Sequence, residues 1–325
     1  MNIAFIIDPI SRLDPGHDTS VALMEAAQAL GHNVWITSAN QLSVSGGTAW
    51  ATLWPVTLTP VSLVEGKWTA PTRWYELGDR ALRPLEDMDA VFMRVDPPVD
   101  TAYLYTTYIL DYVDPSKTLV LNRPDGLRRA NEKMYALQFA DAIPETIVSQ
   151  DKTIIRKFVD DHGAAVFKPL GGKGGEGIFF VEAGDRNFNS LVEVSTQYNT
   201  LPIMVQQYLP AASEGDKRII LLNGEPIGAV NRVPAKGEFR GNMAAGGSVE
   251  KIDITDRERE ICEMVAPVVK RDGLIFVGLD VIGGYLTEIN VTSPTGIREI
   301  DRLNTVRLGE QVVRWIEQAR PMSNL

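Results

Sequence analysis

The chain opens with apolar runs that alternate with one amphipathic stretch. Residues 3–7 are apolar, residues 20–30 carry apolar side chains at helical spacing, and residues 34–36 are apolar again. Gly31 directly follows the amphipathic stretch, and glycine commonly ends helices because it takes the left-handed backbone at no steric cost. This order predicts a strand, a helix and a second strand, and therefore a doubly wound parallel sheet.

A further strand, of the buried type, is expected at residues 90–93, a short distance before two prolines. Pro97 and Pro98 cannot continue a strand in the middle of a sheet, so the chain must leave the sheet there. Loops at the carboxyl ends of such strands are where open α/β sheets bind ligands. The other elements expected in this part of the chain are irregular hairpins (41–74), a helix (101–112) and a strand (118–121).

The character of the sequence changes after Arg123 and Pro124, which mark an expected domain boundary. Asp125 is the predicted N-cap of a helix that turns Lys133 away from its apolar face. That apolar face consists of Leu127, Ala130, Met134 and Leu137. Strands are then expected at 164–168 and 178–181, on either side of a glycine-rich loop.

The glycine-rich loop spans residues 171–177 and contains five glycines in seven positions. Bare backbone N–H groups that reach positive φ values can wrap phosphate oxygens, so the loop is a candidate phosphate site. A flexible surface hairpin is the alternative. Lys168, at the end of the preceding strand, favours the phosphate site, and Lys133 provides a second cation. For Lys168, a solubilising charge on an edge strand is the competing interpretation.

Three oxygen-bearing side chains, Asp280, Glu288 and Asn290, form a second candidate site. Strands are expected at 274–282 and 285–291, joined at Gly283 and Gly284. A two-residue turn would place Asp280 and Glu288 on opposite faces, so we expect a three-residue loop that brings them together. Such oxygen ligands suit magnesium, although ordinary polar alternation on a half-buried strand is the competing interpretation.

A cationic cluster occupies the last third of a chain that is otherwise acidic. Its members are Lys217, Arg218, Arg232, Lys236, Arg240 and Arg298. Residues 233–247 hold four glycines and few apolar residues, which indicates a lid over bound substrate. Arginine suits this work because its planar fork pairs with carboxylate and phosphate oxygens. Exposed surface charge explains any one of these residues equally well.

Composition narrows the class of protein. The 325 residues carry a formal net charge of −10, so attraction to nucleic acid or to anionic lipid is not expected. Neither a signal peptide nor a membrane span is predicted, and the expected location is the cytoplasm. The single cysteine, Cys262, fits a reducing compartment and lies on a predicted helix among apolar residues. The three histidines are scattered, so no metal is assigned to them.

Taken in order, several segments closely resemble bacterial glutathione synthetases of the ATP-grasp superfamily, and the similarity covers nearly the whole chain. The segments are 94–100, 131–133, 168–170, 215–218, 240–242, 276–280, 287–295 and 297–299. The resemblance implies an α/β (α+β) protein in which an N-terminal Rossmann-like (pre-ATP-grasp) domain precedes a two-lobed ATP-grasp fold. The domains implied are 1–123 (N-terminal, substrate-binding), 124–205 (central lobe) and 206–325 (C-terminal lobe).

The resemblance also implies roles for individual residues. ATP would be bound by Lys133, Lys168, Gly172, Lys173, Gly174, Gly175, Gln206, Tyr208, Leu209 and Asp216. The implied catalytic residues are Arg218 and Arg240, and the implied magnesium ligands are Asp280, Glu288 and Asn290. The substrates would contact Asp8, Arg94, Asn242, Ser293, Pro294 and Thr295. Lys173 departs from the family, which often has methionine there, so loop mobility and nucleotide affinity are expected to differ.

The implied reaction joins γ-glutamylcysteine and glycine into glutathione through an acyl phosphate, with release of ADP and phosphate. ATP would be the co-substrate, magnesium or manganese the cofactor, and the protein a homotetramer without nucleic acid or membrane partners. Another ATP-grasp carboxylate-amine ligase, such as a dipeptide or glutamate ligase, is the closest alternative. A nucleotide-binding regulator without turnover is a second. A kinase is a weaker alternative, because the sequence has no His-Arg-Asp or Asp-Phe-Gly motif.

Overall fold

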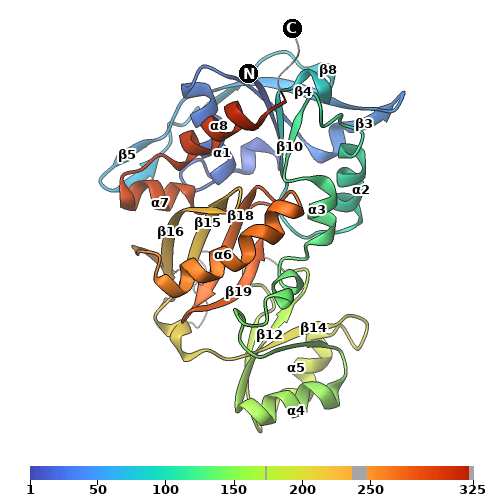
Figure 1. Cartoon of the computed structure of the whole chain (residues 1–325), viewed down its shortest axis with the longest axis vertical. Helices are drawn as coiled ribbons and strands as arrows, with labels where there is room; N and C mark the ends of the chain where they lie inside the picture. The colour runs from blue at the N-terminus through green and yellow to red at the C-terminus, as the bar shows by residue number, and fades with distance from the viewer. Residues whose placement is uncertain (173, 236–246, 322–325) are drawn as a thin grey trace.

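Figure 1 shows the computed structural model, which describes residues 1–172, 174–235 and 247–321. The strands are β1 (Asn2–Ile7), β2 (Asn33–Thr37), β3 (Leu42–Ser45), β4 (Thr48–Leu58), β5 (Ser62–Val64), β6 (Lys67–Thr69), β7 (Tyr75–Leu77), β8 (Ala81–Pro84), β9 (Ala90–Arg94), β10 (Leu119–Leu121), β11 (Thr146–Ser149), β12 (Ala164–Pro169), β13 (Phe179–Glu182), β14 (Ile203–Gln207), β15 (Asp216–Leu222), β16 (Glu225–Val233), β17 (Ser248–Lys251), β18 (Phe276–Ile282) and β19 (Tyr285–Asn290). The helices are α1 (Thr19–Ala29), α2 (Thr101–Leu110), α3 (Pro124–Arg129), α4 (Lys152–His162), α5 (Phe188–Ser195), α6 (Asp256–Arg271), α7 (Ile297–Asn304) and α8 (Leu308–Ala319).

The N-terminal sheet has the order β10-β9-β1-β2-β4-β3, and its first four strands are parallel. This confirms the predicted strand, helix, strand opening, in which α1 connects β1 to β2. The predicted strands at 90–93 and 118–121 correspond to β9 and β10. The region 41–74 is more regular than predicted, because β4 is a long strand that joins the main sheet. Its alternate residues Ala49, Ala51 and Leu53 are fully buried, which explains its length.

The single long helix expected after Asp125 is wrong. Helix α3 starts at Pro124, a residue preorganised for the first helical position, and its N-cap is Arg123 rather than Asp125. It ends at Arg129. A separate 3-10 turn, Met134–Gln138, follows Lys133. Because the helix is interrupted, Lys133 points into the protein and is only 5% exposed, while the supposed core residue Met134 is 42% exposed.

Two further sheets lie below the N-terminal sheet in Figure 1. The four-stranded sheet has the order β11-β14-β12-β13, and the five-stranded sheet has the order β17-β16-β15-β18-β19, both antiparallel. Helices α4 and α5 pack on one face of the smaller sheet, and α6 packs on one face of the larger. The opposite faces border the site, although α7 covers part of the opposite face of the larger sheet. Because β12 lies between β14 and β13, Lys168 is not on an edge strand, which excludes that interpretation.

The hairpin of β18 and β19 has a different loop from the one predicted, but it still places Asp280 opposite Glu288. Ile282 pairs with Tyr285 across a two-residue turn, in which Gly283 (φ 56°) and Gly284 (φ 79°) both take the left-handed conformation. The three-residue loop is therefore wrong. A bulge after Asp280 shifts the register by one residue, so Asp280 still lies directly opposite Glu288.

The C-terminal helices pack against the N-terminal part of the chain. Helices α7 and α8 pack against α1, and their apolar residues share a core with β1 and β9 (Figure 1). The division into 1–123, 124–205 and 206–325 stays a prediction. Cys262 is buried on α6, as expected, and burial raises the pKa of its thiol to about 12. None of the helices that the structure describes has the length and apolar composition needed to cross a membrane.

One buried side chain ties the N-terminal sheet to the five-stranded sheet. The Asn122 amide nitrogen donates to the carbonyl oxygens of Phe276 and Val291, at 2.8 Å each. Its oxygen accepts from the backbone nitrogens of Ile275 and Phe276, at 2.6 and 2.8 Å. Asn122 is 4% exposed, so its backbone partners have little access to water.

We therefore expect Asn122→Ala to lower the free energy of unfolding by at least about 3 kcal/mol, because several buried polar groups lose their partners. Asn189, exposed on α5, provides the control, and Asn189→Ala should change stability by less than about 0.5 kcal/mol. Urea denaturation of the two variants measures the difference. Equal stabilities would show that Asn122 does not hold the sheets together.

Candidate active site between the two sheets

A cleft of about 500 Å³ lies between the four-stranded and five-stranded sheets. Most residues that the sequence singled out as binding or catalytic line it, although they come from distant segments. They are Lys133, Lys168, Gly172, Gly174, Gly175, Gln206, Tyr208, Leu209, Asp216, Arg218, Asp280, Glu288, Asn290, Ser293, Pro294 and Thr295. Lys173, Arg240 and Asn242 lie outside the described residues, as does most of the predicted lid at 233–247.

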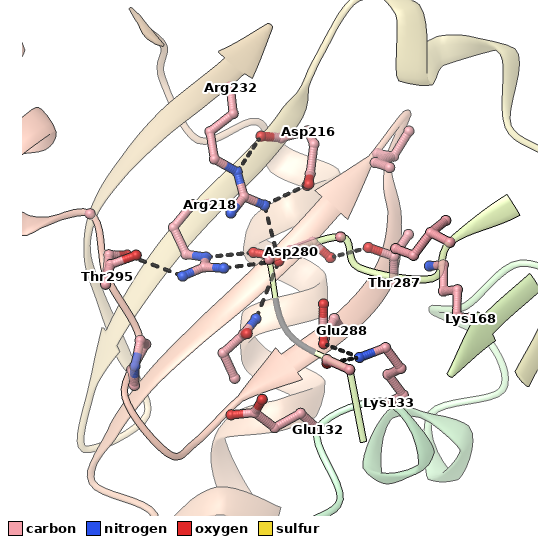
Figure 2. Close-up of a pocket in the computed structure, with 18 of the residues that line it drawn as sticks. Glu132, Lys133, Lys168, Asp216, Arg218, Arg232, Asp280, Thr287, Glu288 and Thr295 are labelled. Carbon is pink, nitrogen blue, oxygen red and sulfur yellow. Dashed lines mark hydrogen bonds and ion pairs between the residues drawn. The ribbon is translucent and has the colours of Figure 1, made fainter. Parts of the chain in front are cut away.

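The register of the five-stranded sheet places three charged side chains in one row. Arg218 on β15 pairs with Asp280 on β18, which pairs with Glu288 on β19. Side chains alternate between the faces of a sheet, so all three point into the cleft (Figure 2). Lys217, the neighbour of Arg218, points to the other face and pairs with Glu258 on α6 at 2.6 Å.

Asp280 is the centre of an ion-pair network in the cleft (Figure 2). Arg218 donates to both of its carboxylate oxygens, at 2.5 and 3.0 Å, and Arg232 approaches the second oxygen at 3.0 Å. The Asn290 amide nitrogen also donates to that oxygen, at 3.2 Å. Burial opposes ionisation of Asp280, but the two guanidinium groups outweigh it and hold the pKa of this carboxyl well below its usual range.

Arg232 also binds Asp216, which extends the network to the first residue of β15. Its Nη2 lies 2.5 Å from the Asp216 carboxylate. Burial raises the pKa of Asp216 to about 6, Arg232 opposes that rise, and the neighbouring Asp280 charge adds to it. The sequence placed Arg232 in the cationic cluster but gave it no role. Only the pairing of β15 with β16 brings it beside Asp216 and Asp280.

Two lysines approach the cleft from the other side. Lys133 Nζ donates to the carbonyl oxygen of Gly172 at 2.9 Å and to the Glu288 carboxylate at 3.0 Å. Lys168 Nζ donates to the side-chain oxygen of Gln206 at 2.7 Å. Burial lowers the pKa of Lys168, and Lys133 contributes further lowering. Both ammonium groups therefore lie where anionic oxygens of a ligand would meet them.

The glycine-rich loop lies beside these lysines. Gly174, Gly175 and Gly177 have φ values of 59°, 78° and 68°, in the left-handed region where side chains are strained. Gly172, Gly174 and Gly175 line the cleft, with backbone rather than side chains facing it. Its role as a phosphate loop stays a prediction.

Apolar side chains line the cleft beside Gln206. They are Val166, Ile178, Tyr208 and Leu209. The Tyr208 ring packs edge-on against Phe180, with centroids 4.7 Å apart. An aromatic base fits such a slot, with backbone and amide groups at its rim.

Another part of the cleft wall is formed by residues 291–296. Glu132 holds this loop, since one of its carboxylate oxygens accepts from the backbone nitrogens of Val291 (2.8 Å) and Thr292 (3.0 Å) and from the Thr292 hydroxyl (2.8 Å). Burial raises the pKa of Glu132. Arg218 donates to the Thr295 carbonyl oxygen at 3.1 Å. The sequence gives Glu132 no role beyond its place in the segment 131–133, because nothing local shows which distant loop it binds.

A second cavity, of about 520 Å³, adjoins the first and shares Asp96 and Pro97 with it. The predicted substrate residues Asp8 and Arg94 line this cavity rather than the main cleft. Arg94 donates to the Ser20 hydroxyl at 3.0 Å and to the Pro294 carbonyl oxygen at 2.9 Å, which links the two cavities. Burial lowers the pKa of Arg94.

The donor set of the cleft fits magnesium only together with a ligand. Within the described residues, no three acidic, histidine or cysteine side chains gather closely enough to hold a metal ion. Asp280, Glu288 and Asn290 offer two carboxylates and one amide. Magnesium in such sites typically takes one or two carboxylates and completes its shell with phosphate oxygens and water.

Two antiparallel sheets that enclose a glycine loop, paired lysines and an acidic hairpin define an ATP-grasp ligase. Solved structures agree on this fold. D-cycloserine synthetase DcsG superposes with a TM-score of 0.64 at 14% identity, covering 98% of this chain and 99% of that one. The ATP-grasp ligase PsnB, in complex with a minimal precursor variant, Mg and ADP, gives 0.62 at 17% identity, covering 97% of each chain.

Sequence comparison narrows the class to one family. The model of the prokaryotic glutathione synthetase N-terminal domain matches residues 1–128, and that of its ATP-grasp domain matches residues 132–305. A glutathione synthetase of Thermosynechococcus vestitus is 67% identical over 97% of this chain and 99% of that protein. One of Nostoc sp. is 66% identical over the full length of both. The chain belongs to the prokaryotic glutathione synthetase family.

The position of Lys168 predicts a selective loss of nucleotide binding. Lys168→Met keeps the length and apolar stem of the side chain but removes a cation from the cleft, so Kd for ATP should rise about ten-fold or more while the fold persists. Thermal shift with and without MgATP measures this.

Lys157→Met is the matched control, because the side chain of Lys157 is 75% exposed on α4, away from the cleft. Full ATP stabilisation of the Lys168 variant would remove this lysine from the nucleotide site.

Proposed function

We propose that the chain joins γ-glutamylcysteine to glycine in the main cleft, through an acyl phosphate formed with ATP. Family membership over the whole chain supports ATP-dependent formation of glutathione, and the enzyme is an ATP-dependent ligase. The observation that carries the residue-level proposal is the row of Arg218, Asp280 and Glu288, which faces two lysines and a glycine loop across one cleft. The roles of individual residues are proposed for this chain from its own geometry.

ATP would lie along the cleft between the two sheets. Its base would occupy the apolar part beside Gln206, Tyr208 and Leu209, with Asp216 on the ribose side. Lys133 and Lys168 would exchange their present protein partners for phosphate oxygens, which offer stronger charge-assisted hydrogen bonds. The glycine loop, including Lys173, would cover the phosphates with backbone N–H groups.

Asp280, Glu288 and Asn290 would hold magnesium beside these phosphates. When bound, the metal neutralises phosphate charge and polarises the bond to the transferred phosphoryl group. To serve as a metal ligand, Asp280 would give up part of its contact with Arg218 and Arg232, which engage its carboxylate oxygens. The Arg218 guanidinium would then be available for negative charge on the phosphoryl group and the acyl phosphate.

The chain supplies position and charge rather than a nucleophile. The carboxylate of γ-glutamylcysteine attacks the terminal phosphate, ADP leaves, and the amine of glycine then displaces phosphate from the acyl phosphate. Ser293, Pro294 and Thr295 would border the glycine end, and Asp8 and Arg94 would hold γ-glutamylcysteine in the second cavity. Arg240 and Asn242 are proposed to close over the intermediate and protect it from water.

The resemblance supplies the remaining proposals: manganese in place of magnesium, a homotetramer and a cytoplasmic location. Another ATP-grasp carboxylate-amine ligase would share the phosphate and metal residues but accept a different amine. The decisive experiment is ADP formation with γ-glutamylcysteine and glycine present, each omitted in turn, with product mass measured in parallel. Sustained ADP release at the full rate without glycine, or a product other than glutathione, would refute the proposed substrates.

Glu288 allows a separate test of the metal site. Glu288→Gln keeps the shape of the side chain but removes a charged ligand, so the magnesium concentration for half-maximal activity should rise at least about ten-fold.

Glu76→Gln, at a side chain that is 63% exposed in the N-terminal domain, is the control. Because Glu288 also binds Lys133, nucleotide affinity without metal is measured in the same variants. An unchanged magnesium requirement rules out Glu288 as a ligand.

A further inference from the structure

Two residues that line the second cavity each have a buried polar atom with no hydrogen-bond partner among the described residues. One is Nη1 of Arg94 and the other is the hydroxyl of Tyr103. Both residues line the cavity, and they are 4% and 3% exposed. An unsatisfied buried donor costs free energy, so folded proteins rarely leave such groups unpaired, and a bound ligand can supply the missing partner.

Tyr103 is fixed in position by the start of α2. The Asp100 side chain caps this helix by accepting from the Tyr103 backbone nitrogen at 2.9 Å, which holds the Tyr103 backbone in the first turn. Burial raises the pKa of Tyr103, and the nearby Glu132 charge adds to that rise. The phenol therefore stays protonated near neutral pH and is available as a donor.

The lining of the cavity carries both signs of charge. Arg94 and Tyr103 offer donors, whereas Asp8, Asp18 and Asp96 offer carboxylate oxygens. A ligand that presents a carboxylate and an ammonium group on one carbon matches this arrangement. The α-carbon of an amino acid carries these two groups. The γ-glutamyl group of the proposed substrate ends in such a head, with a free α-amino and a free α-carboxylate group.

We infer that the Tyr103 hydroxyl, together with Nη1 of Arg94, donates to the α-carboxylate of the γ-glutamyl group and thereby selects substrates that carry it. The inference rests on the proposed function, because it names the part of γ-glutamylcysteine that the second cavity binds. Tyr103 is a specificity residue that contacts the substrate far from the reacting carboxylate. Its hydroxyl affects binding of the substrate rather than phosphoryl transfer.

The test compares Tyr103→Phe with the wild type on three substrates. γ-Glutamylcysteine and glutaryl-cysteine keep the carboxylate, whereas 4-aminobutanoyl-cysteine lacks it. We expect KM of the variant to rise about ten-fold or more for the first two, with kcat nearly unchanged, because a hydrogen bond to a charged group is lost. For 4-aminobutanoyl-cysteine, the variant and the wild type should have equal kcat/KM.

Tyr105→Phe is the matched control, since Tyr105 is on the same helix and 63% exposed. Its constants should equal those of the wild type. In the ligand-free protein, Tyr103→Phe removes a hydroxyl without a partner, so its thermal midpoint should stay the same or rise.

Three outcomes would overturn the inference. They are an unchanged KM for γ-glutamylcysteine, an equal loss on the substrate without the carboxylate, and a lowered thermal midpoint that gives the hydroxyl a structural role. Failure of the proposed function is distinguishable, because wild-type enzyme would then form no glutathione from γ-glutamylcysteine and glycine.

Discussion

The register of the five-stranded sheet is the constraint on which the site depends. Glu288, Asp280 and Arg218 lie on three adjacent strands and face the same cleft only because each pairs directly with the next. A shift of one residue would send each side chain to the opposite face, where α6 and its apolar core lie. The bulge after Asp280 corrects the offset that the two-residue turn would otherwise impose. Thr287, the extra residue, is anchored by its hydroxyl to the Asp280 carbonyl oxygen at 3.1 Å.

The carboxylates of Asp280 and Glu288 form ion pairs with nearby cations in the cleft. Asp280 is held by Arg218 and Arg232, and Glu288 by Lys133. Removing one member of a buried pair leaves a charge uncompensated, at a cost of several kcal/mol. A nucleotide with its metal offers replacement partners to both sides at once, since phosphate meets the cations and the metal meets the carboxylates. Such an exchange keeps the cleft near neutrality, whereas either ligand alone would leave like charges together.

The sequence predicted features formed within one segment better than contacts formed between distant segments. The parallel opening and the strands around the glycine loop are confirmed, because each follows from a local period or motif. The opposition of Asp280 to Glu288 is also confirmed, but it arises from a bulge and not from the expected three-residue loop. The helix through Lys133 is wrong because propensity and spacing do not reveal that the Asn131 side chain starts a new turn by accepting from the Lys133 and Met134 nitrogens. The bulge and the roles of Arg232 and Glu132 were missed for a related reason. Each depends on partners far away in sequence, which no local pattern displays.

Besides sharing Asp96 and Pro97, the two cavities are linked through the backbone of one short loop. Arg94 donates to the Pro294 carbonyl oxygen from the N-terminal sheet, and Arg218 donates to the Thr295 carbonyl oxygen from the five-stranded sheet. Both arginines therefore hold the same short loop from opposite sides. A substrate that draws Arg94, or a nucleotide that draws Arg218, changes the restraint on residues 294–295. Binding in one cavity would thereby bear on the shape of the wall between the two cavities.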